Sequence, residues 1–316
     1  MERTYKIGIN YDKNDPVEVE ARQRGTSNFM VPQMLEKAFR GIPGVEVYDR
    51  QAMTRGVGAK PKMDLILNSM PMNQLEFMDN PNGITAWWDL EECSDPKKEY
   101  FDRCDVIFHP NYNPYQWNLY PEGKSSYLPL ANDFEVSRYY PEEKMIYDVA
   151  FLGREELENV YRRRRTILDY LDEKYFIRRG KAQRGEPSSR AISQGKLTLQ
   201  ISGWDNLEER FFQFGAIRPM LVDYLEELDL IAERDVEYIS FTTDKDCYEK
   251  IAYYLEHMDE AEAIHQRLLK NLKENHTYKN RAEEILRYIR TGERNTDGQY
   301  LWDKAKAKKL KSDYHD

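Results

Sequence analysis

Short apolar runs alternate with polar segments along the whole chain. In the first half they are 5–10 (YKIGIN), 45–48 (VEVY), 63–68 (MDLILN), 84–89 (ITAWWD), 105–108 (DVIF) and 125–131 (SSYLPLA). These runs are short, rich in β-branched or aromatic residues and bounded by turn residues, which is typical of strands. Between them, 29–42 has apolar residues at helical spacing, and Asp95-Pro96 marks a helix start. This alternation predicts a mostly parallel sheet.

The second half repeats the alternation after a break at 132–148, which has no clear period and contains Pro141. Strands are predicted at 147–153, 175–179, 197–202, 219–224 and 238–243, and helices at 162–174, from Pro187, at 207–216 and after an N-cap at Asp244. Two further helices follow. The sequence therefore predicts an α/β protein with two doubly wound domains, residues 1–140 and 141–290, and a helix with a tail at 291–316 that returns to the first domain.

Composition narrows the class of protein. A chain of 316 residues has room for two domains, and an aromatic content of 13% with 23 tyrosines indicates a folded protein. No stretch is apolar enough for a spanning helix or a signal peptide, so we expect a cytoplasmic location. Cys93, Cys104 and Cys247 are widely scattered, which argues against disulfides and against a zinc site.

The charge distribution is uneven. The net charge of -9 argues against a protein dedicated to polyanions, yet basic residues outnumber acidic ones between Arg154 and Gln200, and the tail from Lys304 is rich in lysine. The chain has no GxGxxG, GxxxxGK[ST] or GxSxG motif. These absences argue against NAD-dependent, P-loop and α/β-hydrolase enzymes.

Candidate ligand-binding residues follow predicted strands, because ligands of such folds bind beyond the carboxyl ends of the strands. Gly153 and Arg154 follow the strand at 147–153, where a glycine lets the backbone approach a ligand and an arginine can bind phosphate. A tight turn with a solvated arginine is the alternative. The run from Arg162 to Arg165 points around a helix, so we expect one of the four arginines to face a ligand.

A second group of candidate ligand-binding residues lies around the predicted helix at 207–216. Asp205, Arg210 and Gln213 flank its start, and Asp223 ends the strand that follows. A carboxylate at a strand end can accept ribose hydroxyls, and an arginine nearby can offset diphosphate charge. Helix capping by Asp205 and a solvated Arg210 are the alternative.

In the first half, Asp89 and Glu91 follow one predicted strand and His109 follows another. A histidine near a carboxylate is the usual arrangement of a general base, although a structural histidine is the alternative. Asn10 and Asn68 end two further strands. We expect an acceptor to bind on this side, near Asn10, Asn68 and Glu91.

From about Ser126 to Leu286 the chain contains, in order, YLPLAND, YDVAFLG, an arginine-led helix, ERFFQFGA, MLVDY, KIAYYLEH and HTYKNRAEEIL. In these blocks it resembles glycosyltransferases of the group 1 superfamily, specifically the CgeB-like spore-protein type. The resemblance implies a GT-B fold, in which two Rossmann-like domains face each other across a cleft. It also implies that a nucleotide-diphosphate sugar binds mainly to the second domain, with no further cofactor.

The resemblance also implies roles for single residues. Gly153 and Arg154 match the phosphate-proximal turn, and Arg163 stands for the second basic contact. Relatives carry an R-x-F-E pattern whose glutamate holds the donor ribose; here the pattern reads Arg210-Phe211-Phe212-Gln213, and Arg218 replaces a usual glycine. Asp205 matches an acidic residue near the transferred sugar. His109 is the candidate for a contact to the sugar or phosphate.

We therefore expect a metal-independent glycosyltransferase, because the second half has no DxD-like motif at a strand end. The acceptor, a saccharide, a protein or modified DNA, stays open, as does the oligomeric state. An enzyme that glycosylates modified nucleic acid is one alternative, supported by the basic segments and by the aromatic run HPNYNPYQWNLY. A non-catalytic sugar-nucleotide-binding protein is the other, motivated by Gln213 and Arg218.

Overall fold

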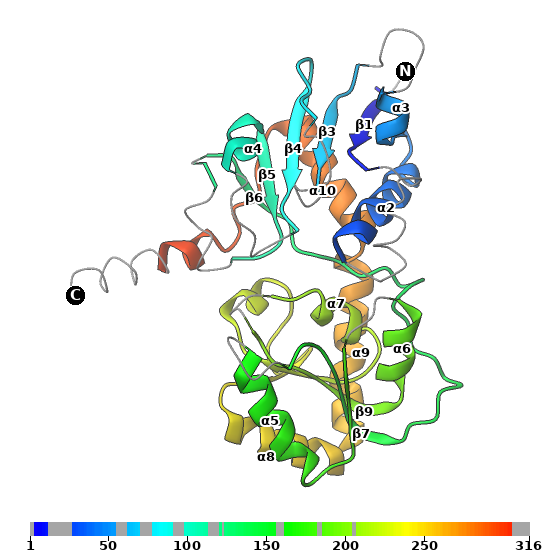
Figure 1. Ribbon diagram of the computed structural model, residues 1–316, viewed down its shortest axis with the longest axis vertical. Coiled ribbons are helices and arrows are strands. Elements are labelled where there is room, and N and C mark those ends of the chain that lie inside the picture. The colour runs from blue at the N-terminus through cyan, green and yellow to red at the C-terminus, as the bar shows by residue number, and fades with distance from the viewer. Residues whose placement is uncertain are drawn as a thin grey trace, which may run out of the picture. The chain divides into compact units, whose positions relative to one another are not determined.

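The computed structural model describes residues 3–11, 27–54, 62–69, 78–90, 98–112, 120–121, 123–155, 161–181, 185–203 and 207–304. The chain divides into two compact units (Figure 1). The first comprises residues 1–129 and 278–316, and the second comprises residues 130–277. The chain thus leaves the first unit at residue 129 and returns to it at 278, whereas the sequence places these points at 140 and 291.

The first unit is built on a six-stranded parallel sheet with the order β2-β1-β3-β4-β5-β6. Its strands are β1 (Tyr5–Ile9), β2 (Val45–Tyr48), β3 (Leu65–Asn68), β4 (Ile84–Trp88), β5 (Val106–His109) and β6 (Ser125–Tyr127). Ile7 of β1 pairs with Val47 on one side and with Leu65 on the other. The strand order therefore reverses between β1 and β3, which is where ligands bind in such sheets.

Helices from both ends of the chain complete the first unit. They are α2 (Ser27–Arg40), α3 (Arg50–Thr54), α4 (Lys98–Arg103) and α10 (Tyr278–Thr291). Leu35 and Phe39 of α2 and Ile285 of α10 are fully buried, and the two helices contact each other. After α10, the Asn295 carbonyl accepts a hydrogen bond from the Tyr127 amide on β6 at 2.8 Å. The C-terminal segment is therefore part of this unit.

The second unit contains a five-stranded parallel sheet with the order β11-β10-β9-β7-β8. Its strands are β7 (Tyr147–Leu152), β8 (Ile177–Gly180), β9 (Gly195–Gln200), β10 (Met220–Asp223) and β11 (Ile239–Phe241). Its helices are α5 (Arg162–Asp172), α6 (Glu186–Ser193), α7 (Arg210–Phe214), the 3-10 helix η2 (Glu226–Leu230), α8 (Asp244–Glu256) and α9 (Met258–Asn275). Here the strand order reverses between β7 and β9.

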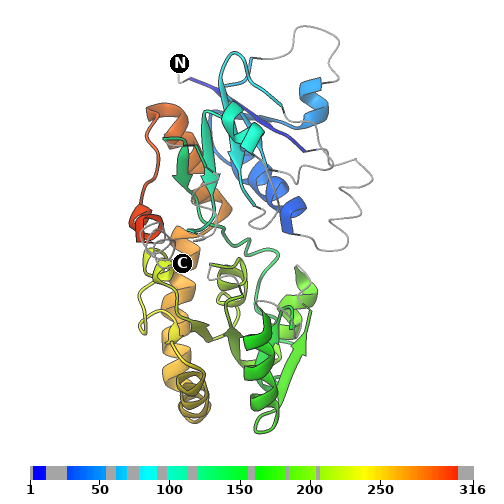
Figure 2. The same ribbon diagram turned by 60° about the vertical axis from the view of Figure 1, so that its left-hand side comes forward.

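Apolar side chains fix the helices of the second unit onto its sheet. Val149 and Phe151 alternate along β7 and pack in one cluster with Leu168 of α5 and Ile251 of α8. All four are at most 1% exposed, and burial of each such side chain stabilises the fold by roughly 1.5–3 kcal/mol. In the view of Figure 2, α9 (orange) runs along the left of this unit and α5 (green) lies away from it, to the right. This packing sets where the N-terminus of α5 meets the carboxyl edge of the sheet.

The predicted strands are all confirmed, with small changes at their ends. β6 ends at Tyr127 instead of 131, since Pro129 has no amide to donate. The predicted N-cap at Asp244 is wrong: the Thr243 hydroxyl accepts the Asp246 amide at 3.1 Å, and α8 begins at Asp244. The predicted helix start at Asp95-Pro96 lies outside the described residues. In the part of the chain that the structure describes, no helix has the length and apolar character to span a membrane.

Candidate functional site

Two turns at the carboxyl edge of the second sheet lie at its switch point. β7 leads into Gly153, and β9 leads through Ile201 to Gly203. A Cβ on Gly153 would overlap the Arg210 guanidinium. A Cβ on Gly203 would lie 2.7 Å from the Tyr161 ring and 3.2 Å from Arg164 Nη2. The absence of a side chain therefore leaves room for the Arg210 guanidinium at Gly153, and for the Tyr161 ring with Arg164 beside it at Gly203.

Both arginines are anchored on the strand ends. Arg210 Nη1 donates to the Leu152 carbonyl at 2.8 Å, and Arg164 Nε donates to the Ile201 carbonyl at 2.7 Å. Glu208 forms an ion pair with each arginine. The Arg164 side chain is 1% exposed and the Arg210 side chain 17%. Burial, with the charge of Arg164 as a second cause, lowers the pKa of Arg210 to about 9, so Arg210 stays protonated at neutral pH. This edge of the sheet thus suits an anion.

Arg163 lies one residue earlier on α5 and contacts the end of β10. Its Nη1 donates to Asp223 Oδ2 at 2.5 Å, and its Nε donates to Asp244 Oδ1 at 2.8 Å. Asp223 also accepts the Ser202 amide at 3.3 Å. The structure therefore brings together two residues that the sequence predicted as donor-binding, Arg163 and Asp223, as partners of each other.

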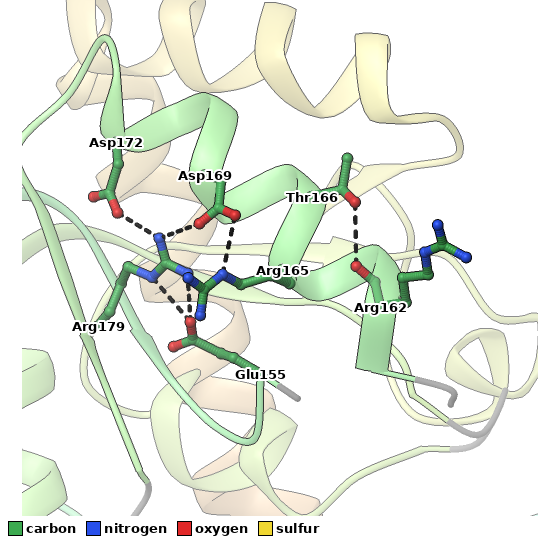
Figure 3. Close-up of polar contacts among 7 residues, drawn as sticks. All are labelled: Glu155, Arg162, Arg165, Thr166, Asp169, Asp172 and Arg179. Atoms are coloured by element: carbon green, nitrogen blue, oxygen red, sulfur yellow. Dashed lines mark hydrogen bonds and ion pairs between the residues drawn. The ribbon is translucent and has the colours of Figure 1, made fainter. Parts of the chain in front are cut away.

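Glu155, the residue after Arg154, is held by a cluster of charges (Figure 3). Glu155 accepts two hydrogen bonds from Arg179 of β8, at 2.9 and 2.5 Å. Arg179 also donates to Asp169 and Asp172 of α5, at 2.8 and 2.5 Å. Burial opposes ionisation of Arg179, but these carboxylates raise its pKa above the ordinary value. The turn is thus fixed to β8 and α5, while the Arg154 side chain itself is exposed.

The remaining predicted residues of this unit are Gln213, Asp205 and Arg218. Gln213 is half-buried on α7, in the same short helix as Arg210. Asp205 lies outside the described residues. Arg218, the other departure from the R-x-F-E pattern, is 9% exposed and donates to the Ser193 carbonyl at 2.8 Å. Arg218 therefore has a structural role away from the two turns.

At the switch point of the first unit, Asn10 and Asn68 contact each other. Asn10 Nδ2 donates to Asn68 Oδ1 at 2.8 Å, and Asn68 Nδ2 donates to the Ala86 carbonyl at 3.3 Å and to that of Met78 at 3.1 Å. Both asparagines are at most 3% exposed. The sequence placed them at neighbouring strand ends, and the structure shows that their amides bond β1 to β3 and β4.

His109 is buried in a cluster of rings. The cluster contains Tyr112, Tyr120, Tyr127 and Trp302. The Trp302 ring is nearest, with 4.4 Å between ring centroids, and His109 Nδ1 lies 2.9 Å from the Asn111 carbonyl. Burial lowers the pKa of His109 to about 3, so the imidazole is neutral at neutral pH. A general base must reach the proton that it removes, so this geometry favours a structural His109.

Asp89 is joined to the same cluster through Tyr120, whose hydroxyl donates to Asp89 Oδ2 at 2.9 Å. Asp89 is 2% exposed. The sequence run HPNYNPYQWNLY was interpreted as a surface for stacking bases, but its Tyr112 and Tyr120 are buried in this cluster. Nothing in the run signalled Trp302, which follows almost 200 residues later along the chain. Glu91 lies outside the described residues.

Among the side chains that the structure describes, no group of three or more His, Cys, Asp or Glu residues is placed to hold a metal ion.

Comparisons with known proteins bear on both units. Residues 169–287 match a family model described as glycosyl transferase-like. An α-glucosyltransferase solved with UDP and a 13-mer DNA containing an HMU base has a TM-score of 0.60 at 12% identity, over 91% of this chain and 100% of that chain. The fold is GT-B. A search of the curated proteins finds no sequence match.

Two further GT-B structures are similar over nearly the whole chain. AviGT4, a glycosyltransferase involved in avilamycin A biosynthesis, has a TM-score of 0.57 at 11% identity, over 90% of this chain and 97% of that chain. Alr3699/HepE of Anabaena, solved with UDP and glucose, has a TM-score of 0.53 at 10% identity, over 91% and 100%. Of the candidate residues, the family match includes Asp205, Arg210, Gln213 and Asp223.

Proposed function

We propose that this protein is a glycosyltransferase whose donor is a nucleotide-diphosphate sugar. The observation that carries the proposal is the pair of glycine turns at the β7/β9 switch point, each lying against an anchored arginine. Backbone amides of such turns and nearby guanidinium groups bind phosphate well. The similarity to GT-B structures solved with UDP supports a nucleotide ligand.

In this proposal, Gly153 allows the diphosphate to approach the backbone, and the exposed Arg154 contacts it directly. Arg210 lies beneath the same turn and adds positive charge where negative charge develops on the leaving diphosphate. These cations take the place of a metal ion, so we propose that the enzyme is metal-independent. Arg163, Asp223, Gln213 and Asp205 are proposed for the nucleoside and sugar, with Gln213 on the ribose.

The acceptor is proposed to bind at the carboxyl edge of the first sheet, where Asn10, Asn68, Asp89 and His109 end or follow their strands. Glu91, two positions after Asp89 in the sequence, is proposed for the same side. Modified DNA is a second candidate acceptor, favoured by the likeness to the α-glucosyltransferase solved with DNA and by the lysine-rich tail. UDP-glucose complexes among the similar structures support a hexosyl donor. Membership of the CgeB-like type and a cytoplasmic location are part of the proposal.

The test is a donor assay with purified protein and radiolabelled UDP-, GDP-, ADP- and TDP-sugars, with and without EDTA. We expect one donor to be hydrolysed slowly in the absence of acceptor, and the rate to be the same with EDTA. Loss of turnover on chelation that manganese restores would contradict metal independence. A set of donors that neither bind nor react would contradict the proposed function. Salt-sensitive retention on DNA, compared with retention on a neutral resin, tests the nucleic-acid acceptor.

A further inference from the structure

Glu208 lies at the carboxyl edge of the second sheet, which we call the donor edge, between the arginines beside the turns at Gly153 and Gly203. It was not among the donor-binding residues that the sequence predicted. It precedes α7, and its carboxylate pairs with Arg164 of α5 and with Arg210 of α7. Its side chain is 16% exposed. One carboxylate therefore joins two helices that are far apart in the sequence.

Through these arginines, Glu208 is linked to the ends of both strands at the switch point. Arg210 bonds the last carbonyl of β7, and Arg164 bonds the Ile201 carbonyl just after β9. A guanidinium group held in a largely buried position needs its partner, because removal of that partner leaves a poorly solvated charge. Loss of the Glu208 charge should thus move the guanidinium groups away from the turns at Gly153 and Gly203.

A direct contact between Glu208 and the donor is unfavourable. A carboxylate next to a diphosphate would repel it, since like charges at short range raise the free energy of binding. Any favourable effect of Glu208 on a diphosphate must therefore act through the cations that it holds. Glu208 pairs with Arg210 beneath Gly153, whereas the Arg154 side chain is exposed. The effect of Glu208 on a diphosphate is therefore expected through Arg210.

We propose that Glu208 is a positioning residue that sets the two glycine turns of the donor edge through Arg164 and Arg210. The inference rests on the proposed function, since it assumes that a nucleoside diphosphate binds these turns. It assigns to Arg210 an indirect role, coupled to Glu208, in place of an independent contact with phosphate.

The experiment measures UDP affinity by calorimetry for the parent, Glu208→Gln, Glu208→Asp and a matched control, Glu143→Gln. Glu143 has a similar exposure of 19% and an arginine partner, Arg190 at 2.7 Å, but it precedes the amino end of β7 and accepts a hydrogen bond from Gln194, which precedes β9. We expect Glu208→Gln to weaken UDP at least about tenfold, as for a lost charged bond. Glu208→Asp should recover part of this loss, and Glu143→Gln should stay within about twofold of the parent.

The double variant Glu208→Gln/Arg210→Gln separates positioning from independent contact. If the two residues act as one unit, the double variant binds UDP no more weakly than the weaker single variant. Losses that multiply would overturn the proposal, because Arg210 would then bind the donor without Glu208. Parent-like UDP affinity in Glu208→Gln would overturn it as well.

Amide hydrogen exchange without nucleotide distinguishes failure of the positioning role of Glu208 from failure of the proposed function. Peptides covering 151–155 and 201–203 should exchange faster in Glu208→Gln than in the parent, and Glu143→Gln should leave them unchanged. If the parent binds no nucleoside diphosphate, the proposed function fails and exchange alone decides. Faster exchange at both turns then supports the positioning role, and unchanged exchange overturns it.

Discussion

The first five strands of each sheet follow the same order, but the two sheets differ in the chemistry at their switch points. In the first unit, Asn10 and Asn68 are neutral amides, and their NH2 groups donate to Asn68 Oδ1 and to nearby carbonyls, respectively. In the second, Arg164 and Arg210 are cations anchored beneath glycine turns. A parallel sheet thus places polar side chains at one edge, but the residue type decides whether they form internal bonds or create a charged site. This difference supports donor binding on the second unit.

The largest effect is expected from Gly153→Ala. An added Cβ would overlap the Arg210 guanidinium and lie 2.9 Å from the Phe151 ring, so Arg210 must leave its place. We expect overpacking to cost roughly 1–3 kcal/mol of stability and UDP affinity to fall at least about thirtyfold. Gly180→Ala is the matched control at the end of β8, because its Cβ would meet only a Leu152 methyl at 3.8 Å. Equal UDP affinities for Gly153→Ala and Gly180→Ala would contradict donor binding at the Gly153 turn.

Arg154→Ala tests direct phosphate contact at the same turn. Because the side chain is exposed, its loss should leave the unfolding midpoint unchanged. UDP affinity should fall by about 1.5–3 kcal/mol, the value of a charged hydrogen bond. The exposed Arg162→Ala on α5 is the control and should bind like the parent. Unchanged affinity in Arg154→Ala would place the phosphate elsewhere.

His109 provides a test in the first unit. The unfolded ring takes up a proton near pH 6.5, whereas burial lowers the pKa of the folded ring to about 3. Stability should therefore be full above pH 6.5 and fall on acidification towards pH 3, by up to about 1.4 kcal/mol per pH unit. His109→Phe should flatten this dependence in urea unfolding followed from pH 7 to 4. If the stability of His109→Phe falls with pH as steeply as that of the control His257→Gln, the result would contradict a buried neutral imidazole at His109.

Gln213 should give the smallest change. If it contacts the donor ribose, Gln213→Ala should weaken the nucleotide sugar by about 1 kcal/mol. Gln213→Glu should keep or tighten binding, since an ionised acceptor bonds a hydroxyl more strongly. A silent alanine variant together with a glutamate variant that does not bind would show that Gln213 faces an anion or an apolar group.

The elements could be predicted because their signals are local. The β-branched and aromatic runs marked every strand, and strand ends then located Asn10, Asn68, Gly153 and Asp223. The partners could not be predicted, since Arg164 and Glu208 are 44 positions apart and meet only in the folded chain. For the same reason, the run of four arginines did not reveal that Arg164 is buried while Arg163 pairs with two carboxylates.

The central claim is that a nucleotide sugar binds at the switch point of the second unit. Its most direct test is an amide hydrogen-exchange footprint of the parent protein with saturating UDP-glucose, with UDP and with no ligand. We predict protection of peptides covering 151–155 and 201–203 with both ligands, while peptides covering 8–11 and 66–69 of the first unit stay unchanged with UDP. Protection by UDP that is confined to the first unit, or absent from both 151–155 and 201–203, would contradict the account.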